Sequence, residues 1–407
     1  MKQIRLCIVA GLLLALAVPM LAAYAESPIH LSNRLRVGYD DNINLLPEDM
    51  DPVDSFRLIE ELEFLVNLNM ERMYLGLRYR PSLIWYTDRD EANADNKDYD
   101  FLNDLDLNFS YEFTPSLALA LNDTLRASQL PSIYDEYYIV RRDDDNIYNS
   151  ALATLSYNIL PKTRLDLSGR HILLDYDNEE SARYGNYYSL VGGLTLRQQL
   201  ASRTTVLGDA RYQTLTYSEA PADHNRDADM IFFGLGAEQT FSPSLIGSLR
   251  AGIENRQYDD EDYDDHNAPY GEASLTFLPS PRTRLTGAAS YSIDESDAGA
   301  YLSQNRTYLS LSLAHDITAK WSFYASTAFT LNEYDADYAL DDTDPATPAL
   351  DDGTEKTYLV SLRLAYRINR INWLELGYQF TKLDTDLQNR ESYDRNRVDL
   401  GWKIQLF

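Results

Sequence analysis

The chain has 407 residues, a formal net charge of −28 and one cysteine, Cys7. Its acidity argues against nucleic acid as a partner, because such a partner needs a basic surface. The 31 tyrosines and 13 phenylalanines exclude a disordered chain, which could not carry so many aromatic side chains. The length would allow about two or three domains, but no linker rich in Pro, Gly or Ser divides the chain.

The N-terminal segment, residues 1–25, has the pattern of a cleaved signal peptide. Lys2 and Arg5 precede an apolar run, and Ala23 and Ala25 form the A-x-A cleavage pattern. A membrane-spanning helix is the alternative for this segment. Because the cysteine lies within it, residues 26–407 have no disulfide framework, and we expect them to form a single barrel domain.

The segment 108–121, NFSYEFTPSLALAL, shows the unit from which the rest of the chain is built. Aromatic residues at every second position from Phe109 to Phe113 alternate with polar ones, and a turn follows at 114–116. Leucines then alternate with small residues. This pattern predicts a β-hairpin with one apolar face. The same unit returns at 241–249, FSPSLIGSL.

Alternating segments of this kind recur along the chain and predict about eighteen strands, with about sixteen as the alternative. Each segment is long enough to cross the hydrocarbon layer of a membrane at a tilt. The predicted strands are 30–39, 56–68, 73–86, 99–113, 116–127, 146–159, 163–176, 186–200, 204–217, 229–241, 245–257, 269–278, 283–293, 304–314, 321–333, 356–368, 372–383 and 394–407.

The connections between these strands alternate between short turns and long acidic loops. The short turns are 69–72, 114–116, 160–162, 201–203, 242–244, 279–282, 316–320 and 369–371. The long loops are 40–54, 87–98, 128–145, 177–185, 218–228, 259–268, 294–303, 334–355 and 384–393. Short turns at one end and long loops at the other are typical of an outer-membrane β-barrel.

The predicted fold is therefore an all-β, transmembrane, up-and-down antiparallel β-barrel in a bacterial outer membrane. A soluble sandwich also has alternating strands, but it rarely keeps this asymmetry between loops. In lipid every backbone group must be paired within the protein, so the sheet must close on itself. The terminal Phe407 resembles the signal read by the machinery that inserts barrels, although the apolar parity of the last strand runs through Leu406.

The run 36–43, RVGYDDNI, resembles the first-strand motif of the putative β-barrel porin-2 family. Members of that family have a signal peptide followed by an outer-membrane barrel. The resemblance implies such a barrel here. It also implies a possible link with exopolysaccharide export, and it offers no catalytic residues to carry over.

The face opposite the apolar one carries many arginines and acids, which a barrel would turn towards its lumen. Two compatible interpretations follow. The charges form cross-strand ion pairs that stiffen the wall, or they line a water-filled channel whose arginines favour small polar, anionic or saccharide solutes. The candidate lumen-lining residues are Arg34, Arg36, Arg78, Arg80, Arg126, Arg170, Arg211, Arg250, Arg363, Arg367, Glu61 and Asp106.

One long acidic loop suggests a metal site, because Ca²⁺ prefers clusters of carboxylate oxygens. No EF-hand spacing is present, and a solvated, self-repelling loop is the alternative. The candidate ligands are Asp259, Asp260, Asp262, Asp264 and Asp265. Divalent cations could also join such loops to the phosphates of lipopolysaccharide, which together with membrane lipid is an expected partner.

Catalysis is not predicted, because the five histidines accompany no nucleophile elbow, nucleotide loop, zinc spacing or haem motif. We predict a porin-like channel without a cofactor, since a barrel of this size leaves an aqueous lumen unless a loop, such as 128–145 or 334–355, plugs it. The alternative is a structural or adhesive surface barrel whose acidic loops bind divalent cations, matrix or a protein partner. The particular solute and the oligomeric state are not predicted.

Overall fold

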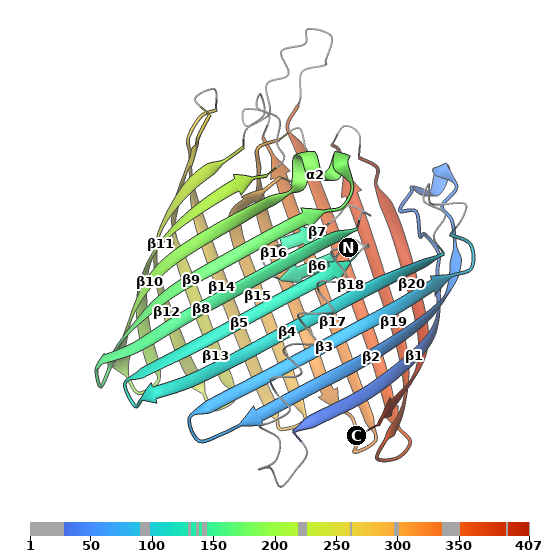
Figure 1. Cartoon of the computed structure of the whole chain (residues 1–407), viewed down its shortest axis with the longest axis horizontal. Helices are drawn as coiled ribbons and strands as arrows, with labels where there is room; N and C mark the ends of the chain where they lie inside the picture. Colours follow the sequence, from blue (N-terminus) through green and yellow to red (C-terminus); the bar gives the residue numbers. More distant parts are fainter. Residues whose placement is uncertain are drawn as a thin grey trace.

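Eighteen antiparallel strands form one sheet that closes on itself (Figure 1). The computed structural model describes residues 28–89, 98–128, 132–135, 138–140, 145–218, 226–260, 263–296, 301–335, 351–387 and 390–406. The first strand, β1 (Ile29–Asp40), pairs with β2 (Ser55–Asn69) on one side and with the last strand, β20 (Tyr393–Gln405), on the other. The predicted up-and-down barrel is confirmed.

The other strands follow in chain order around the ring, and their ends agree with the predicted strands to within a few residues. They are β3 (Met73–Tyr86), β4 (Tyr99–Thr114), β5 (Leu117–Ser128), β8 (Asn146–Leu160), β9 (Thr163–Tyr176), β10 (Tyr187–Ala201), β11 (Thr204–Tyr217), β12 (Ala228–Ser242), β13 (Leu245–Tyr258), β14 (His266–Ser280), β15 (Thr283–Glu295), β16 (Ser303–Asp316), β17 (Trp321–Tyr334), β18 (Gly353–Arg367) and β19 (Asn372–Thr385).

Alternation of side chains gives the wall two faces. On β12, Ile231, Phe233 and Leu235 are exposed on the outside, Leu235 to 75%, whereas Phe232 between them is buried inside. A row of exposed apolar side chains fits contact with lipid tails. Since no water is available in the hydrocarbon layer, closure of the ring also pairs the backbone groups of what would otherwise be two free edges.

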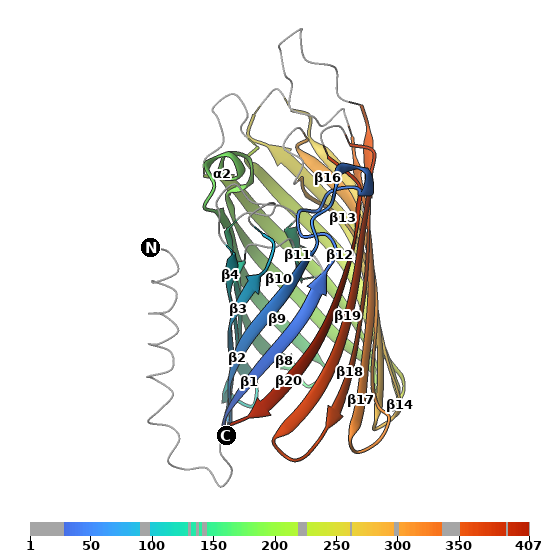
Figure 2. The ribbon, with the colours of Figure 1, turned by 90° about the vertical axis from the view of Figure 1, so that its right-hand side faces the viewer.

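The two ends of the barrel differ, as predicted, and Figure 2 shows the short turns at its lower end and the longer connections at its upper end. Some long connections contain short elements that were not predicted: η2 (Glu48–Met50), α2 (Glu179–Gly185) and a hairpin of β6 (Ser132–Asp135) with β7 (Tyr138–Val140). Figure 1 draws this hairpin within the outline of the barrel, below α2. Within the described ranges, no helix is both long and apolar enough to cross a bilayer.

Side chains from the end of the RVGYDDNI run reinforce the backbone pairing between the first and last strands. The guanidinium of Arg395 donates two hydrogen bonds, of 2.9 and 2.8 Å, to the carboxylate of Asp40. Arg57 lies 3.5 Å from the same carboxylate, and the side chain of Asp40 is fully buried. A Cβ atom on Gly38 would lie 3.0 Å from the carbonyl oxygen of Val398, so glycine permits the close approach of β20.

The next two residues of the run continue this junction. The carboxylate of Asp41 accepts hydrogen bonds from the backbone and side-chain amides of Asn396, at 2.6 and 2.7 Å. The side-chain amide of Asn42 donates to the carbonyl oxygen of Asp394 at 2.9 Å. We call Asp40, Asp41, Asn42, Arg395 and Asn396 the closure clasp. It explains physically why an Asp-Asp-Asn run follows the first strand.

Part of the barrel interior near the long-loop end is filled by apolar side chains. Two doubled aromatic pairs contribute to this, because adjacent strand residues face opposite sides. In the pairs Tyr187–Tyr188 and Phe232–Phe233, the first ring is buried inside and the second is exposed outside. The inner cluster comprises Tyr148, Leu174, Tyr176, Ala182, Tyr187, Leu215, Tyr217, Ala228, Met230, Phe232, Tyr258, Tyr270 and Leu302.

Candidate functional site

The inward charges of the wall are joined into ion pairs, and the first group surrounds Glu61 on β2. Arg34 and Arg36 of β1 both bind this carboxylate, Arg36 at 3.0 Å. Arg34 also lies 2.9 Å from Glu375 of β19, and Arg36 lies 3.7 Å from Asp399 of β20. Three of the predicted lumen residues therefore form one largely buried network that spans the seam of the barrel.

A second network covers β3 to β5, where the register places arginines opposite aspartates. Arg78 is paired across the strands with Asp106, and Arg80 with Asp104, and both pairs form salt bridges. Arg126 of β5 bridges the two carboxylates, with 2.6 Å to Asp106 and 3.7 Å to Asp104. Opposite charges directly across a sheet stabilise the pairing of its strands.

A third network lies on β11 to β14 and contains two more of the predicted residues. Arg211 and Arg250 share the carboxylate of Asp209, at 3.1 and 3.4 Å. The guanidinium of Arg211 also lies over the rings of Phe232 and Tyr270, 4.7 and 4.9 Å from their centroids. Such cation–π contacts fix the orientation of the planar guanidinium.

Glycines on two neighbouring strands make room for this arrangement. A Cβ atom on Gly234 would lie 2.1 Å from the hydroxyl oxygen of Tyr270, and a Cβ atom on Gly252 would lie 2.6 Å from its ring. The ring of Tyr270 therefore lies flat against bare backbone, and its hydroxyl donates to Asp209 at 3.4 Å.

The remaining predicted arginines have no carboxylate partner among the described residues. Arg170 of β9 lies opposite Leu152 and Val191 in the register, which are both apolar. Arg363 of β18 is exposed on the inner face. Arg367 lies at the short-turn end, where it donates to the carbonyl oxygen of Asn369 at 3.1 Å.

The long-loop end of β15 separates from β14 and reaches into the interior, while it stays paired with β16 up to Glu295. Its pairing with β14 stops at Tyr291. Beyond that point Glu295 accepts a hydrogen bond of 2.7 Å from Arg256 of β13 and another of 2.7 Å from the hydroxyl of Tyr217 on β11. Arg226 stacks on the ring of Tyr217, 4.1 Å from its centroid. We call Glu295, its partners Arg256 and Tyr217, and Arg226 the β15 latch, because these contacts hold the end of β15 against β11 and β13.

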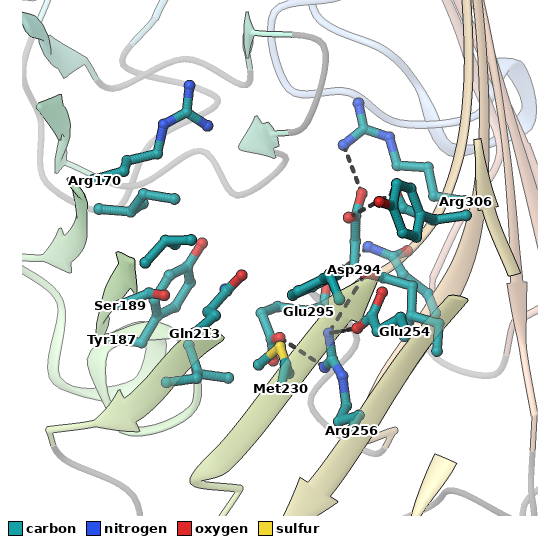
Figure 3. A pocket seen from close by; sticks show the side chains of 18 of the residues that line it. Arg170, Tyr187, Ser189, Gln213, Met230, Glu254, Arg256, Asp294, Glu295 and Arg306 are labelled. Carbon is teal, nitrogen blue, oxygen red and sulfur yellow. Dashed lines mark hydrogen bonds and ion pairs between the residues drawn. The ribbon is translucent and has the colours of Figure 1, made fainter. Parts of the chain in front are cut away.

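A cavity of about 330 Å³ lies between the latch and the wall of β8 to β12 (Figure 3). Arg170, Tyr187, Ser189 and Gln213 stand on one side of it, and Glu254, Arg256, Asp294, Glu295 and Arg306 stand on the other. On the latter side the charges are paired, with 3.0 Å between Arg306 and Asp294 and 3.4 Å between Arg256 and Glu254. The volume is in the range of small-molecule sites in proteins.

The structure describes only some of the residues of the other predicted sites. Ala23, Ala25, Asp262 and Phe407 lie outside the described residues. Asp259, Asp264 and Asp265 are exposed, and Asp260 is half-buried. Within the described part of the chain, no three His, Cys, Asp or Glu side chains are grouped so that they could hold a metal ion. The calcium site stays a prediction, since one of its five candidate ligands is not described.

The sequence analysis missed two features of the interior, the β15 latch and the apolar cluster. The doubled aromatic pairs could have revealed the cluster, because they place rings on the lumen side of a wall otherwise predicted to be polar. No comparable signal marks the latch. Glu295 falls in a segment predicted as an acidic loop, and its partners are distant in the sequence.

A closed barrel of eighteen strands, with an apolar outer face and charges within, defines an outer-membrane barrel of the porin type. A family model described as Putative beta-barrel porin 2 matches residues 32–406. The chain belongs to this family, which confirms the resemblance of its first-strand motif. It is a porin-like barrel of the bacterial outer membrane.

Three solved structures of low sequence identity are similar to this chain. OccAB3 of Acinetobacter baumannii is 13% identical with a TM-score of 0.46, and the match covers 93% of this chain and 99% of that one. OpdK of Pseudomonas aeruginosa, solved with vanillate, is 10% identical with a TM-score of 0.48 and coverages of 93% and 98%. OpdO of Pseudomonas aeruginosa is 14% identical with a TM-score of 0.46 and coverages of 93% and 98%. A comparison with curated proteins gave no match.

Proposed function

We propose that the barrel is a passive channel for small polar solutes. The observation that carries this proposal is the water-accessible charge inside the wall. The side chains of Arg78 and Arg164 are 40% and 45% exposed although both face inward. Tyr324, on the inner face of β17, is 44% exposed. Water next to such groups is what an aqueous lumen requires, and barrels of this strand number are wide enough to hold one.

The ion pairs also bear on which solutes would pass. Most inward arginines are paired with a carboxylate, so positive and negative charges alternate along the wall and its net charge is small. Arg170 and Arg363, which have no carboxylate partner among the described residues, add a modest positive bias. A channel of this kind would admit neutral sugars and small anions more readily than large cations.

Liposome swelling tests this proposal. Vesicles that carry the folded protein and are diluted into isotonic arabinose or sodium gluconate should swell, at rates that fall as the size of the solute rises. Vesicles with heat-denatured protein are the control. Folded protein that leaves the vesicles no more permeable than this control would contradict a channel and would favour the structural or adhesive alternative.

We also propose three kinds of partner: lipopolysaccharide, the barrel-insertion machinery and an exported polysaccharide. Only the last of these concerns transport, and it rests on the resemblance to the family. A permeability that ends at the size of a disaccharide would favour uptake of small solutes over export of a polymer.

A further inference from the structure

On one wall of the cavity beside the β15 latch, three polar side chains lack a partner among the described residues. Arg170 has no carboxylate partner among the described residues, as shown above. The hydroxyl of Ser189 is buried, 1% exposed, and makes no hydrogen bond to a described residue. No described residue is hydrogen-bonded to the side-chain amide of Gln213. A buried polar group without a partner is costly, and such groups in a cavity point to a ligand that supplies the missing bonds.

The register places these three groups close together on one face. Arg170, Val191 and Gln213 form a single row across β9, β10 and β11. Ser189 lies two residues from Val191 on the same strand, so its side chain faces the same way. Adjacent strands are about 5 Å apart, so the row from Arg170 to Gln213 spans about 10 Å of backbone. This is the length of one small cyclic molecule.

The surface between the three groups is apolar. Ile172, Leu174, Val191, Leu215 and Met230 line the same wall. These side chains can neither donate nor accept hydrogen bonds. A sugar ring laid over them would lose water from its hydroxyl groups without replacement, which is unfavourable. An apolar ring would instead be stabilised there by its own removal from water.

The three carboxylates on the opposite side of the cavity are already paired with arginines and do not favour a bound cation. Glu254, Asp294 and Glu295 are each paired with Arg256 or Arg306. Of the arginines that line the cavity, only Arg170 has no carboxylate partner among the described residues. Glu272, the remaining carboxylate of the lining, makes no ion pair with a described residue and lies opposite Arg250 in the register. A planar guanidinium binds a carboxylate through two parallel hydrogen bonds.

We infer that this cavity binds a small carboxylate with an apolar ring, with the carboxylate on Arg170, the ring on the Ile172–Val191–Met230 surface, and a polar substituent within reach of Ser189 or Gln213. The inference rests on the proposed channel function and narrows its solute class from polar solutes in general. The arginines of the wall would favour cyclic organic acids and acidic sugars alike. The apolar surface of the cavity distinguishes these two classes, because it favours cyclic organic acids over acidic sugars.

Calorimetric titration of the folded protein in detergent tests the inference with three matched probes. Cyclohexanecarboxylate and glucuronate share a six-membered ring and a carboxylate, and differ mainly in hydroxyl groups. Cyclohexylmethanol keeps the apolar ring and lacks the charge. We expect cyclohexanecarboxylate to bind at least about tenfold more tightly than either of the others, a difference of about 1.4 kcal/mol.

Arg170→Gln should weaken the binding of cyclohexanecarboxylate by about tenfold or more. Arg363→Gln is the matched control, since it removes another unpaired inward arginine that does not line the cavity, and it should leave the affinity unchanged. Retention of heat-modifiable mobility in gels shows that each variant is folded. Tighter binding of glucuronate, or equal loss in both variants, would overturn the inference.

Titration in detergent requires no ion flow, so the inference and the channel proposal fail separately. Folded protein that binds cyclohexanecarboxylate through Arg170 but does not permeabilise vesicles would refute the channel and keep the site. Permeable vesicles without binding in the titration would refute the site and keep the channel.

Discussion

The carboxylate of Asp40 holds Arg395 and Arg57 at the point where the first strand meets the last, and all three side chains are buried. Asp40→Asn removes the charge and leaves both arginines inside without their partner. Loss of one member of a buried ion pair costs about 3–5 kcal/mol. We expect that decrease in the free energy of unfolding, measured by urea titration of the folded barrel in detergent.

Asp51→Asn is the control for this change, because Asp51 is an exposed loop residue close in the sequence and without a partner among the described residues. Asp51→Asn should not change the urea concentration at the midpoint of unfolding. If the two variants unfolded at the same urea concentration, the closure clasp would not be what joins β1 to β20.

At single positions, the sequence predicted which way a side chain faces and not what it binds. Parity alone placed Arg34, Arg126 and Arg170 on the inner face. Whether each is neutralised depends on the neighbouring strand, and two of them meet carboxylates whereas Arg170 meets only apolar residues. Register between strands depends on packing and turn geometry along the whole sheet, so alternation within one strand cannot reveal it.

At the scale of single strands, the assignment of the lipid-facing side can be tested. Leu119 is paired across the sheet with Leu155, which is exposed on the lipid side, whereas Ala118 is paired with Ser156 on the inner face. Leu119→Arg should reduce the stability of the inserted barrel by about 2–4 kcal/mol if it lies near the bilayer midplane, and Ala118→Arg by much less. The measure is the fraction of heat-modifiable protein after refolding into lipid vesicles. Equal losses would mean that the two faces of β5 are assigned the wrong way round.

The inward end of β15 is an element-scale feature with a testable effect on ion flow. Glu295→Ala removes the acceptor of both Arg256 and Tyr217, so the strand end loses its carboxylate contacts with β13 and β11 and keeps its pairing with β16. We expect a higher mean single-channel conductance than in the wild type. Glu333→Ala alters an exposed carboxylate at the same end of the barrel and should not change the conductance. No difference between the variants would show that the latch does not narrow the path.

Element boundaries were predictable because period-two alternation and short turns mark each strand directly. The β6–β7 hairpin, α2 and the departure of β15 from β14 were not. The hairpin and α2 lie in segments predicted as polar loops, whereas β15 leaves β14 beyond Tyr291, near the end of the predicted strand 283–293. The position of the β15 end depends on residues distant in the sequence, as the hydrogen bond from Tyr217 to Glu295 shows. The predicted plugs, 128–145 and 334–355, are described only in part, and the inward segment that the structure does show comes from β15.

For the molecule as a whole, the difference in loop length predicts its orientation in the membrane. A protease site placed at Asp264, an exposed residue of a long loop, should be cut from outside intact cells. A site at Ser280, in a short turn, should be cut only after the outer membrane has been opened. Both sites reacting from the same side would contradict the up-and-down barrel in the membrane.

The selectivity of the whole barrel depends on two opposing sets of charges. Acidic loops at one end raise the local concentration of cations, while the unpaired wall arginines favour anions. At physiological salt the Debye length is about 8 Å, so exposed loop charges are largely screened from the lumen. Charges confined within the wall are screened less. The wall should therefore outweigh the net charge of −28 at that salt concentration, and the loops should regain influence at low salt.

Recording the purified, folded protein in a planar bilayer under a salt gradient tests the central claim most directly. The account predicts discrete conductance steps and a reversal potential near zero or weakly anion-selective, which moves towards cation selectivity as the salt concentration is lowered. A folded protein that inserts without conductance steps would contradict an aqueous channel. Strong cation selectivity that persists at high salt would instead mean that acidic groups, rather than the arginine-bearing wall, form the constriction.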